Sequence, residues 1–183
     1  MNPLNFFVQY QINPTKLNSY KGKQNMKRLL VLLALTCFLT SGLFGQKLSE
    51  TESLQLENEV LKVNAEMVKA AEAKDLEKLF SFVLENDRGA VVQGGIILLT
   101  RAEVMESTRN SFQGLVSINY RMDNEYVTAL SPTLALLIAD GLTTFTLEDG
   151  RTISRAFAQS ILFSRQDDKW KVLHAHRSFP ANR

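Results

Sequence analysis

The sequence predicts an α+β domain in which about three helices come first and a long, strongly curved antiparallel sheet follows. Between residues 46 and 114, apolar residues recur every three or four positions, as they do on one side of a helix. After residue 114 the pattern changes to four long strand-like runs that are separated by turn residues. Strands of this length must coil, so we expect the helices to cover the concave face of the sheet.

The first predicted helix covers residues 49–73. Its apolar positions form one stripe at the helical period. They are Leu56, Val60, Val63, Met67 and Ala70. Asp75 is a suitable N-cap for a second helix over residues 76–84. A short strand pair is expected around residues 91–92 and 96–99, because two glycines separate these apolar segments.

A capping box predicts the third helix. Thr100 and Glu103 have the spacing at which each side chain bonds the other residue's backbone N–H, and Gly114 is placed to end the helix. Asp149 and Gly150 are a strong signal for a two-residue hairpin turn between long strands. The four predicted strands of this antiparallel meander cover about 115–130, 133–147, 151–165 and 169–179.

The chain has three predicted parts: a leader or mis-assigned start at residues 1–25, a signal peptide at 26–45, and one folded domain at 46–183. Lys27 and Arg28 precede the apolar run Leu29–Leu43, and Gly45 is a small residue at a plausible cleavage point. The run is shorter than the roughly 20 residues that a membrane helix needs. We therefore expect an exported protein, periplasmic or extracellular, that does not contact the membrane after cleavage.

Charge and cysteine content exclude several classes of function. Residues 1–45 contain five basic and no acidic residues, which leaves 16 Lys and Arg against 19 Asp and Glu elsewhere, a net charge of −3. This slightly acidic domain gives no reason to expect nucleic-acid binding. Cys37 is the only cysteine and lies in the signal peptide, so no disulfide is expected. The motifs of nucleotide hydrolysis, serine hydrolysis and zinc proteolysis are absent from the sequence.

The last predicted strand carries the main candidate residues. Because alternate residues of a strand share a face, two rows are expected: Val172, His174, His176 and Ser178 on one face, and Leu173, Ala175, Arg177 and Phe179 on the other. A cation among Leu, Ala and Phe is unusual on a surface, so Arg177 is a candidate for binding a carboxylate in a pocket through its planar guanidinium. The alternative is a salt bridge to a buried carboxylate, or a place on the rim.

His174 and His176 allow three interpretations. They would form a metal pair only with a third ligand, which an Asp or Glu would have to supply. They would also suit general acid or base chemistry near neutral pH, or packing at the sheet or a dimer face. Asp140 lies inside an apolar run, where a charge is costly unless it is paired. It is a candidate proton-transfer base, a partner for Arg155 or Arg177, or the mark of a bulge.

The order of elements resembles the nuclear transport factor 2 superfamily. The segment AEMVKAAEAKDLEKLFSFV is similar to the start of that fold. The segment DDKWKVLHAHRSFP is similar to the closing strand of SnoaL-like domains and of the calcium/calmodulin-dependent kinase II association domain. The resemblance covers about residues 50–180 and implies a cone-shaped fold and a homodimer formed through the sheet. In the kinase domain the arginine that matches Arg177 lies in an interior pocket, but a second pocket arginine is replaced here by Ile161.

Three hypotheses about function follow. The first is a protein that binds a small, partly apolar molecule whose carboxylate faces Arg177, with His174, Arg155 and Tyr126 as further ligand-binding candidates. The second is an isomerase, cyclase or dehydratase in which Asp140 or His176 moves a proton, as the resemblance to steroid isomerases implies for a carboxylate. The third is a homo-oligomeric interaction module. None of the three requires a metal or cofactor.

Overall fold

A computed structural model of the chain describes residues 48–85 and 90–180. These residues belong to one compact unit, Gln46–Arg183. The predicted leader and signal peptide at residues 1–45 lie outside the described residues. Among the described helices, none is both long and apolar enough to cross a membrane.

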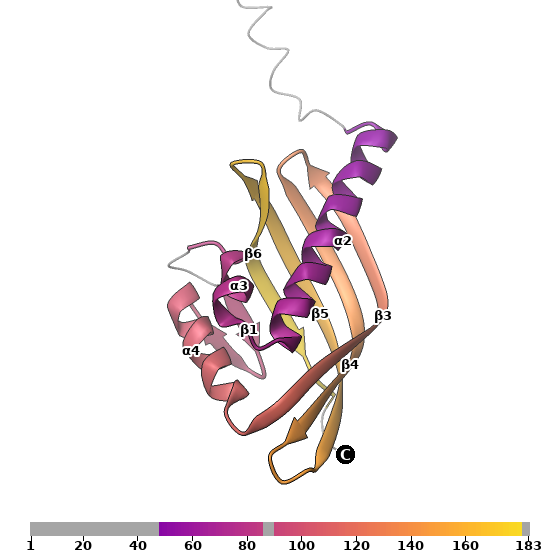
Figure 1. The fold of residues 1–183 in the computed structure, drawn as a ribbon. Helices are drawn as coiled ribbons and strands as arrows, with labels where there is room; N and C mark the ends of the chain where they lie inside the picture. Colours follow the sequence, from indigo (N-terminus) through magenta and orange to yellow (C-terminus); the bar gives the residue numbers. More distant parts are fainter. Residues whose placement is uncertain (1–47, 86–89, 181–183) are drawn as a thin grey trace, which may run out of the picture. The chain divides into compact units, whose positions relative to one another are not determined.

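The predicted order of elements is confirmed (Figure 1). The helices are α2 (Glu50–Glu72), α3 (Leu76–Ser81) and α4 (Arg101–Phe112), and the strands are β1 (Val91–Gln93), β2 (Ile96–Leu98), β3 (Leu115–Ser131), β4 (Leu134–Leu147), β5 (Thr152–Gln166) and β6 (Lys169–Ser178). Helix caps account for the boundaries. Asp75 Oδ1 accepts the hydrogen bond of the Lys78 backbone N–H at 2.9 Å. Gly114 adopts a φ of 71°, which lets the chain leave α4 for β3.

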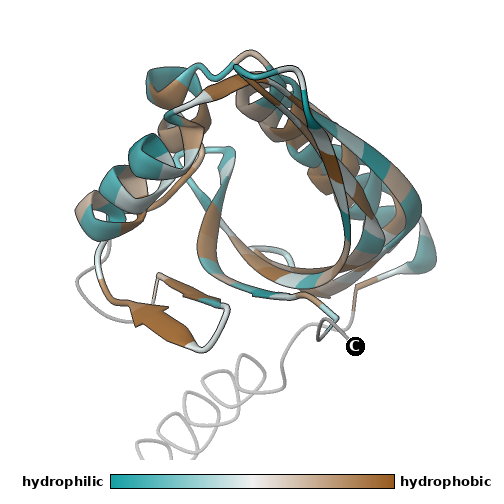
Figure 2. Ribbon diagram, turned by 90° about the horizontal axis from the view of Figure 1, so that it is seen from below, coloured by the Kyte–Doolittle hydropathy of each residue, from teal (hydrophilic) through white to brown (hydrophobic). Residues whose placement is uncertain are grey.

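One curved, unclosed sheet has the strand order β2-β1-β6-β5-β4-β3. Strands β3 to β6 form the predicted antiparallel meander. The hairpin β1–β2 joins the free side of β6, where β1 runs parallel to β6 with Val91 opposite Ala175. The sequence did not indicate this parallel pairing. Figure 2 shows the hairpin as a largely hydrophobic segment at the edge of the sheet, and Ile96 and Ile97 are 62% and 63% exposed.

The second helix is shorter than predicted. It ends at Ser81 instead of residue 84, because the next backbone groups bond to β6 instead of continuing the helix. Val172 N–H donates to the Phe82 carbonyl at 2.8 Å, and Leu84 N–H donates to the Val172 carbonyl at 3.0 Å. This short parallel bridge ties the end of α3 to the sheet.

The hydrophobic core lies between α2 and one end of the sheet. Leu56 and Val60 of α2 pack against the inner side of three strands. The strand residues of this cluster are Ala135, Leu137 and Ala139 of β4, Ile161 and Phe163 of β5, and Trp170 and Val172 of β6. α2 therefore covers the concave face along this part of the sheet (Figure 1).

A bulge in β6 changes the predicted rows of side chains. Leu162 pairs with His174 and Phe163 pairs with Val172, so Leu173 is an extra residue in β6. The prediction that Val172 shares a face with the histidines is therefore wrong. Val172 faces the core, and beyond the bulge the inner positions are Ala175 and Arg177, opposite the buried residues Ile161 and Gln159 of β5.

Glu59 on α2 should make the protein's stability depend on pH in the acid range. Trp170 Nε1–H donates to Glu59 Oε2 at 3.0 Å, and this bond is the largest cause that lowers the pKa of Glu59 from its ordinary value of 4.5. A lowered pKa gives stability that is present above 4.5 and lost as the pH falls toward the folded-state pKa. Glu59→Gln should therefore flatten the fall in unfolding free energy below pH 4.5, measured by urea denaturation between pH 3 and 6 as a rough working range.

Glu57→Gln is the matched control, because the Glu57 carboxylate makes no hydrogen bond or ion pair with the residues that the structure describes. This control should retain the acid-range slope of the wild type. An equal slope for Glu59→Gln and the wild type would show that the bond to Trp170 does not couple protonation to folding.

Candidate functional site

Two adjoining cavities lie beyond the core: the smaller one lies between the inner face of the sheet and helices α2, α3 and α4, and the larger one lies between the sheet and α4. Their volumes are about 190 Å³ and 400 Å³. Both are bordered by Tyr120 of β3 and Arg177 of β6. The smaller cavity extends toward the core residue Ile161, and the larger one extends toward Phe145 and Phe179. Together they have the size and the mainly apolar lining of a small-molecule site.

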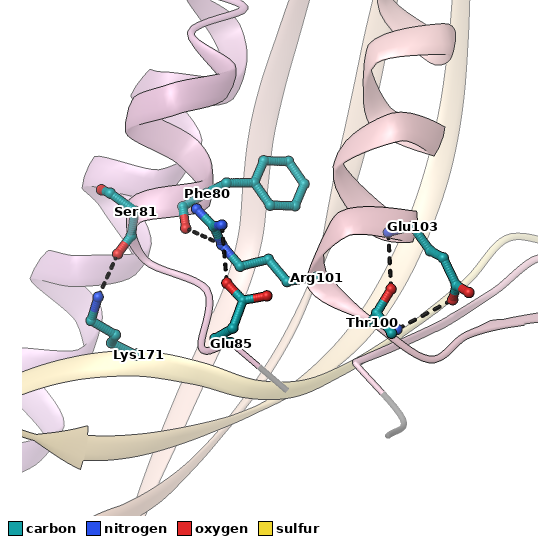
Figure 3. Close-up of polar contacts among 7 residues, drawn as sticks. All are labelled: Phe80, Ser81, Glu85, Thr100, Arg101, Glu103 and Lys171. Atoms are coloured by element: carbon teal, nitrogen blue, oxygen red, sulfur yellow. Dashed lines mark hydrogen bonds and ion pairs between the residues drawn. The ribbon is translucent and has the colours of Figure 1, made fainter. Parts of the chain in front are cut away.

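α4 is the outer wall of the cavities. Val104, Thr108 and Phe112 recur every fourth residue and border both cavities. None of the residues of α4 is buried, because this helix lies over a hollow and not over packed side chains. Arg101 holds its first turn in place: Nε donates to the Phe80 carbonyl at 3.0 Å and Nη1 lies 3.3 Å from Glu85 Oε2 (Figure 3).

Arg177 is held in a fixed orientation on the inner face. Its Nε and Nη2 donate to Gln159 Oε1 at 3.1 and 2.6 Å, since Gln159 lies directly opposite on β5. The guanidinium carbon lies 4.9 Å from the ring centre of Phe157 and 5.5 Å from that of Tyr120. Both rings offer cation–π contacts. Among the described residues, no carboxylate forms an ion pair with Arg177, so its charge is not neutralised by a neighbour.

A second polar pair lies further along the same inner face. Thr143 of β4 and Arg155 of β5 are opposite each other in register, and both border the larger cavity. Thr143 is only 1% exposed, and its Oγ1 has no hydrogen-bond partner among the described residues. Arg155 is exposed and forms no ion pair with any carboxylate that the structure describes.

The cavities are positively charged. Arg155 and Arg177 are the only Lys, Arg, Asp or Glu residues in the described lining of either cavity. This contrasts with the acidic balance of residues 46–183 as a whole. A low-dielectric hollow with two cations and no anion attracts a negatively charged ligand.

Of the three interpretations of Asp140, only the bulge agrees with the structure, since β3 has an extra residue between Met122 and Asn124, opposite Gly141 and Asp140. Ala139 and Gly141 face inward, so Asp140 lies on the opposite, outer face and is exposed. Its Oδ1 accepts a hydrogen bond from Asn124 Nδ2 at 2.9 Å, and it pairs with neither Arg155 nor Arg177. The expectation of a buried carboxylate was wrong because the outer side of β4 is itself rich in apolar residues, so the run is apolar on both faces.

The other candidates divide between the two faces. Tyr126 lies on the outer face, is 65% exposed and borders neither cavity. His174 also lies outside both linings, opposite Leu162. His176 is exposed and borders the smaller cavity. Within residues 48–85 and 90–180 no cluster of three or more His, Cys, Asp or Glu residues could hold a metal ion.

Thr143 is the site residue that sequence reasoning missed. It stands next to Thr144 in a run of alternating residues, and nothing in the pattern distinguishes the threonine that faces inward from the one that faces outward. Only the register with β5 shows that Thr143, and not Thr144, faces the cavity beside Arg155.

Residues 60–182 match the SnoaL-like domain. The chain belongs to the SnoaL-like family. This assignment agrees with the resemblance of its closing strand and with the observed fold. Among curated proteins, no sequence matches this SnoaL-like chain.

Solved structures with a similar fold include members of the NTF2-like superfamily. A protein from Streptomyces avermitilis, proposed to be a dehydratase of the NTF2-like family, is 20% identical with a TM-score of 0.61, covering 68% of this chain and 97% of its own. A hexachlorocyclohexane dehydrochlorinase (LinA-type3) from Novosphingobium barchaimii LL02 is 14% identical with a TM-score of 0.62, covering 72% and 90%. A proposed calcium/calmodulin-dependent protein kinase II association domain from Xanthomonas campestris is 13% identical with a TM-score of 0.60, covering 68% and 88%. At these identities the likeness shows the fold alone.

Proposed function

We propose that this SnoaL-like domain binds a small, partly apolar molecule that carries a carboxylate, and that Arg177 binds the carboxylate. The observation that carries this proposal is the position of Arg177, a cation on the wall of a mainly apolar cavity whose described lining contains no acid. A charge removed from water is costly unless an opposite charge accompanies it. Gln159 accepts two of the guanidinium hydrogen bonds and fixes its plane, which leaves the remaining N–H groups for a ligand.

Replacing Arg177 with glutamine should remove most of the affinity for a monocarboxylate. Hexanoate is a suitable probe, and hexanamide is its uncharged control. Because a charge-assisted hydrogen bond contributes about 1.5–3 kcal/mol, Arg177→Gln should weaken hexanoate binding by at least about tenfold. Isothermal titration calorimetry measures this change directly.

Two further variants keep the test decisive. Arg151→Gln removes an exposed arginine that pairs with Asp149 and borders none of these cavities, so it should bind hexanoate as the wild type does. Arg177→Lys keeps the charge but loses the planar pair of donors, and should bind with intermediate affinity. Unchanged hexanoate binding by a folded Arg177→Gln variant would contradict the proposal.

An isomerase, cyclase or dehydratase activity is the second candidate function. Its support is that His176 borders the smaller cavity, and that proteins of similar fold include a dehydrochlorinase and a proposed dehydratase. Since Asp140 borders neither cavity and His176 borders the smaller one, His176 is the candidate general base in this alternative. The expected homodimer stays a prediction; its candidate surface is the outer face, where Tyr126 and Ile138 are 65% and 50% exposed.

A further inference from the structure

The larger cavity is bordered by a buried hydroxyl group that forms no hydrogen bond with the described residues. Thr143 is 1% exposed, and its Oγ1 finds no partner among the described residues. Leaving a buried hydroxyl unpaired is unfavourable, and such groups are rare in folded proteins. Tyr120 lies opposite Thr143 on β3 and Arg155 lies opposite it on β5, and neither side chain forms a hydrogen bond with its hydroxyl.

Arg155 lies beside this hydroxyl. The two residues are directly opposite each other on β4 and β5, which places their Cβ atoms roughly 5 Å apart. The threonine hydroxyl and the guanidinium both donate hydrogen bonds. An oxyanion between them would accept from both, which satisfies Thr143 and neutralises Arg155 at once.

Arg155 and Arg177 occupy the two ends of one cavity wall. Arg155, Phe157 and Gln159 alternate along the inner face of β5, and Arg177 lies opposite Gln159. Gln159 lies four positions after Arg155 on the strand, which places their Cα atoms roughly 13 Å apart. Tyr120, which borders both cavities and packs edge-on against the buried Phe157, supplies an apolar surface between the two cations.

From this arrangement we propose a second anion subsite formed by Thr143 and Arg155, which rests on the carboxylate site proposed at Arg177. The ligand then carries two carboxylates joined by an apolar segment. One carboxylate binds Arg177, the apolar segment lies along Tyr120, and the other carboxylate binds Arg155 and the Thr143 hydroxyl.

Matched pairs of probes test this subsite in the purified protein. Calorimetry compares the dicarboxylates succinate, adipate and azelate with the monocarboxylates butyrate, hexanoate and nonanoate, which have the same chain lengths. The wild type should prefer the dicarboxylate of the best-fitting length by about tenfold, the value of one additional charge-assisted contact. Arg155→Gln should abolish this preference, so that the dicarboxylate binds with no higher affinity than its matched monocarboxylate.

Thr143→Val distinguishes a ligand-binding hydroxyl from a purely structural one, because it should change stability and dicarboxylate affinity in opposite directions. Valine removes the unpaired hydroxyl at nearly constant shape, so the free protein should unfold at a higher temperature while dicarboxylate affinity falls. Arg151→Gln, away from these cavities, should change neither quantity.

The outcomes separate the two proposals. If dicarboxylates bind no more tightly than their monocarboxylate partners and Arg155→Gln has no effect, the second subsite is wrong and the site at Arg177 stands. If Thr143→Val binds dicarboxylates as the wild type does, the hydroxyl is no part of the subsite, which overturns it as proposed. If neither the monocarboxylates nor the dicarboxylates bind the wild type, the carboxylate site proposed at Arg177 is wrong as well.

Discussion

Gly141→Ala is expected to destabilise the protein by about 3 kcal/mol or more, at or above the upper end of ordinary overpacking. A Cβ at this position would lie 2.0 Å from the Arg121 carbonyl oxygen and 3.0 Å from its carbon. Both atoms belong to the backbone of β3, so no side-chain rotation relieves the clash. β3 would have to move away from β4 next to the bulge between Met122 and Asn124. Urea denaturation measures this loss. Because folded proteins typically have an unfolding free energy of about 5–15 kcal/mol, the substitution removes a large part of it.

Gly150→Ala is the matched control for this substitution. Gly150 has a φ of 83° and nothing within 4 Å of its added Cβ, so alanine there introduces conformational strain without a clash. The expected cost is about 1–2 kcal/mol. Equal losses for the two variants would show that β3 and β4 separate easily and that Gly141 is not required for their contact.

Phe163→Ala should cost about 3–5 kcal/mol, because it removes a fully buried aromatic side chain and leaves a cavity. Phe163 is 0% exposed and faces Ala135 on one neighbouring strand and Val172 on the other. Ala135 is too small to fill the space that the ring vacates. The free energy of unfolding from urea denaturation measures the effect.

Phe112→Ala removes the same ring from a different environment. Phe112 is half-buried on α4 and borders both cavities, so its removal enlarges an existing hollow instead of opening one in the core. Its cost should be less than half that of Phe163→Ala. If the two costs are equal, α4 belongs to the core and the wall of the cavities is not an independent layer.

Much of the fold could be predicted because its signals are local. Caps at Asp75 and Thr100 and the Asp149–Gly150 turn act within a few residues, and the structure places helix starts and a hairpin at these points. The hairpin loop has three residues instead of the predicted two, because Leu147 N–H donates to the Arg151 carbonyl and Gly150 N–H donates to the Leu147 carbonyl. The alternation of apolar residues likewise predicts the four long strands. The parallel pairing of β1 with β6 was not predicted, since it joins segments far apart in the chain.

The candidate site was harder to predict because it depends on which face each residue occupies. The extra residue Leu173 reverses the order of side chains in β6, and no composition signal marks it. Asp140 shows the related difficulty that a strand with two apolar faces does not reveal which of them is interior. Arg177 borders both cavities, as a cation in a row of apolar residues predicts, because the bulge lies before it and leaves it in the same row as Ala175.

The core and the larger cavity occupy different stretches of the same strands. On β4 the packed residues end at Ala139 and the cavity lining begins at Thr143, while on β5 Phe163 belongs to the core and Arg155 to the cavity. Residues that border the larger cavity can therefore be replaced while the packed core residues of the same strands keep the chain folded. Single substitutions on α4, none of whose residues is buried, should therefore change the wall of the cavities at a smaller cost in stability than substitutions in the core.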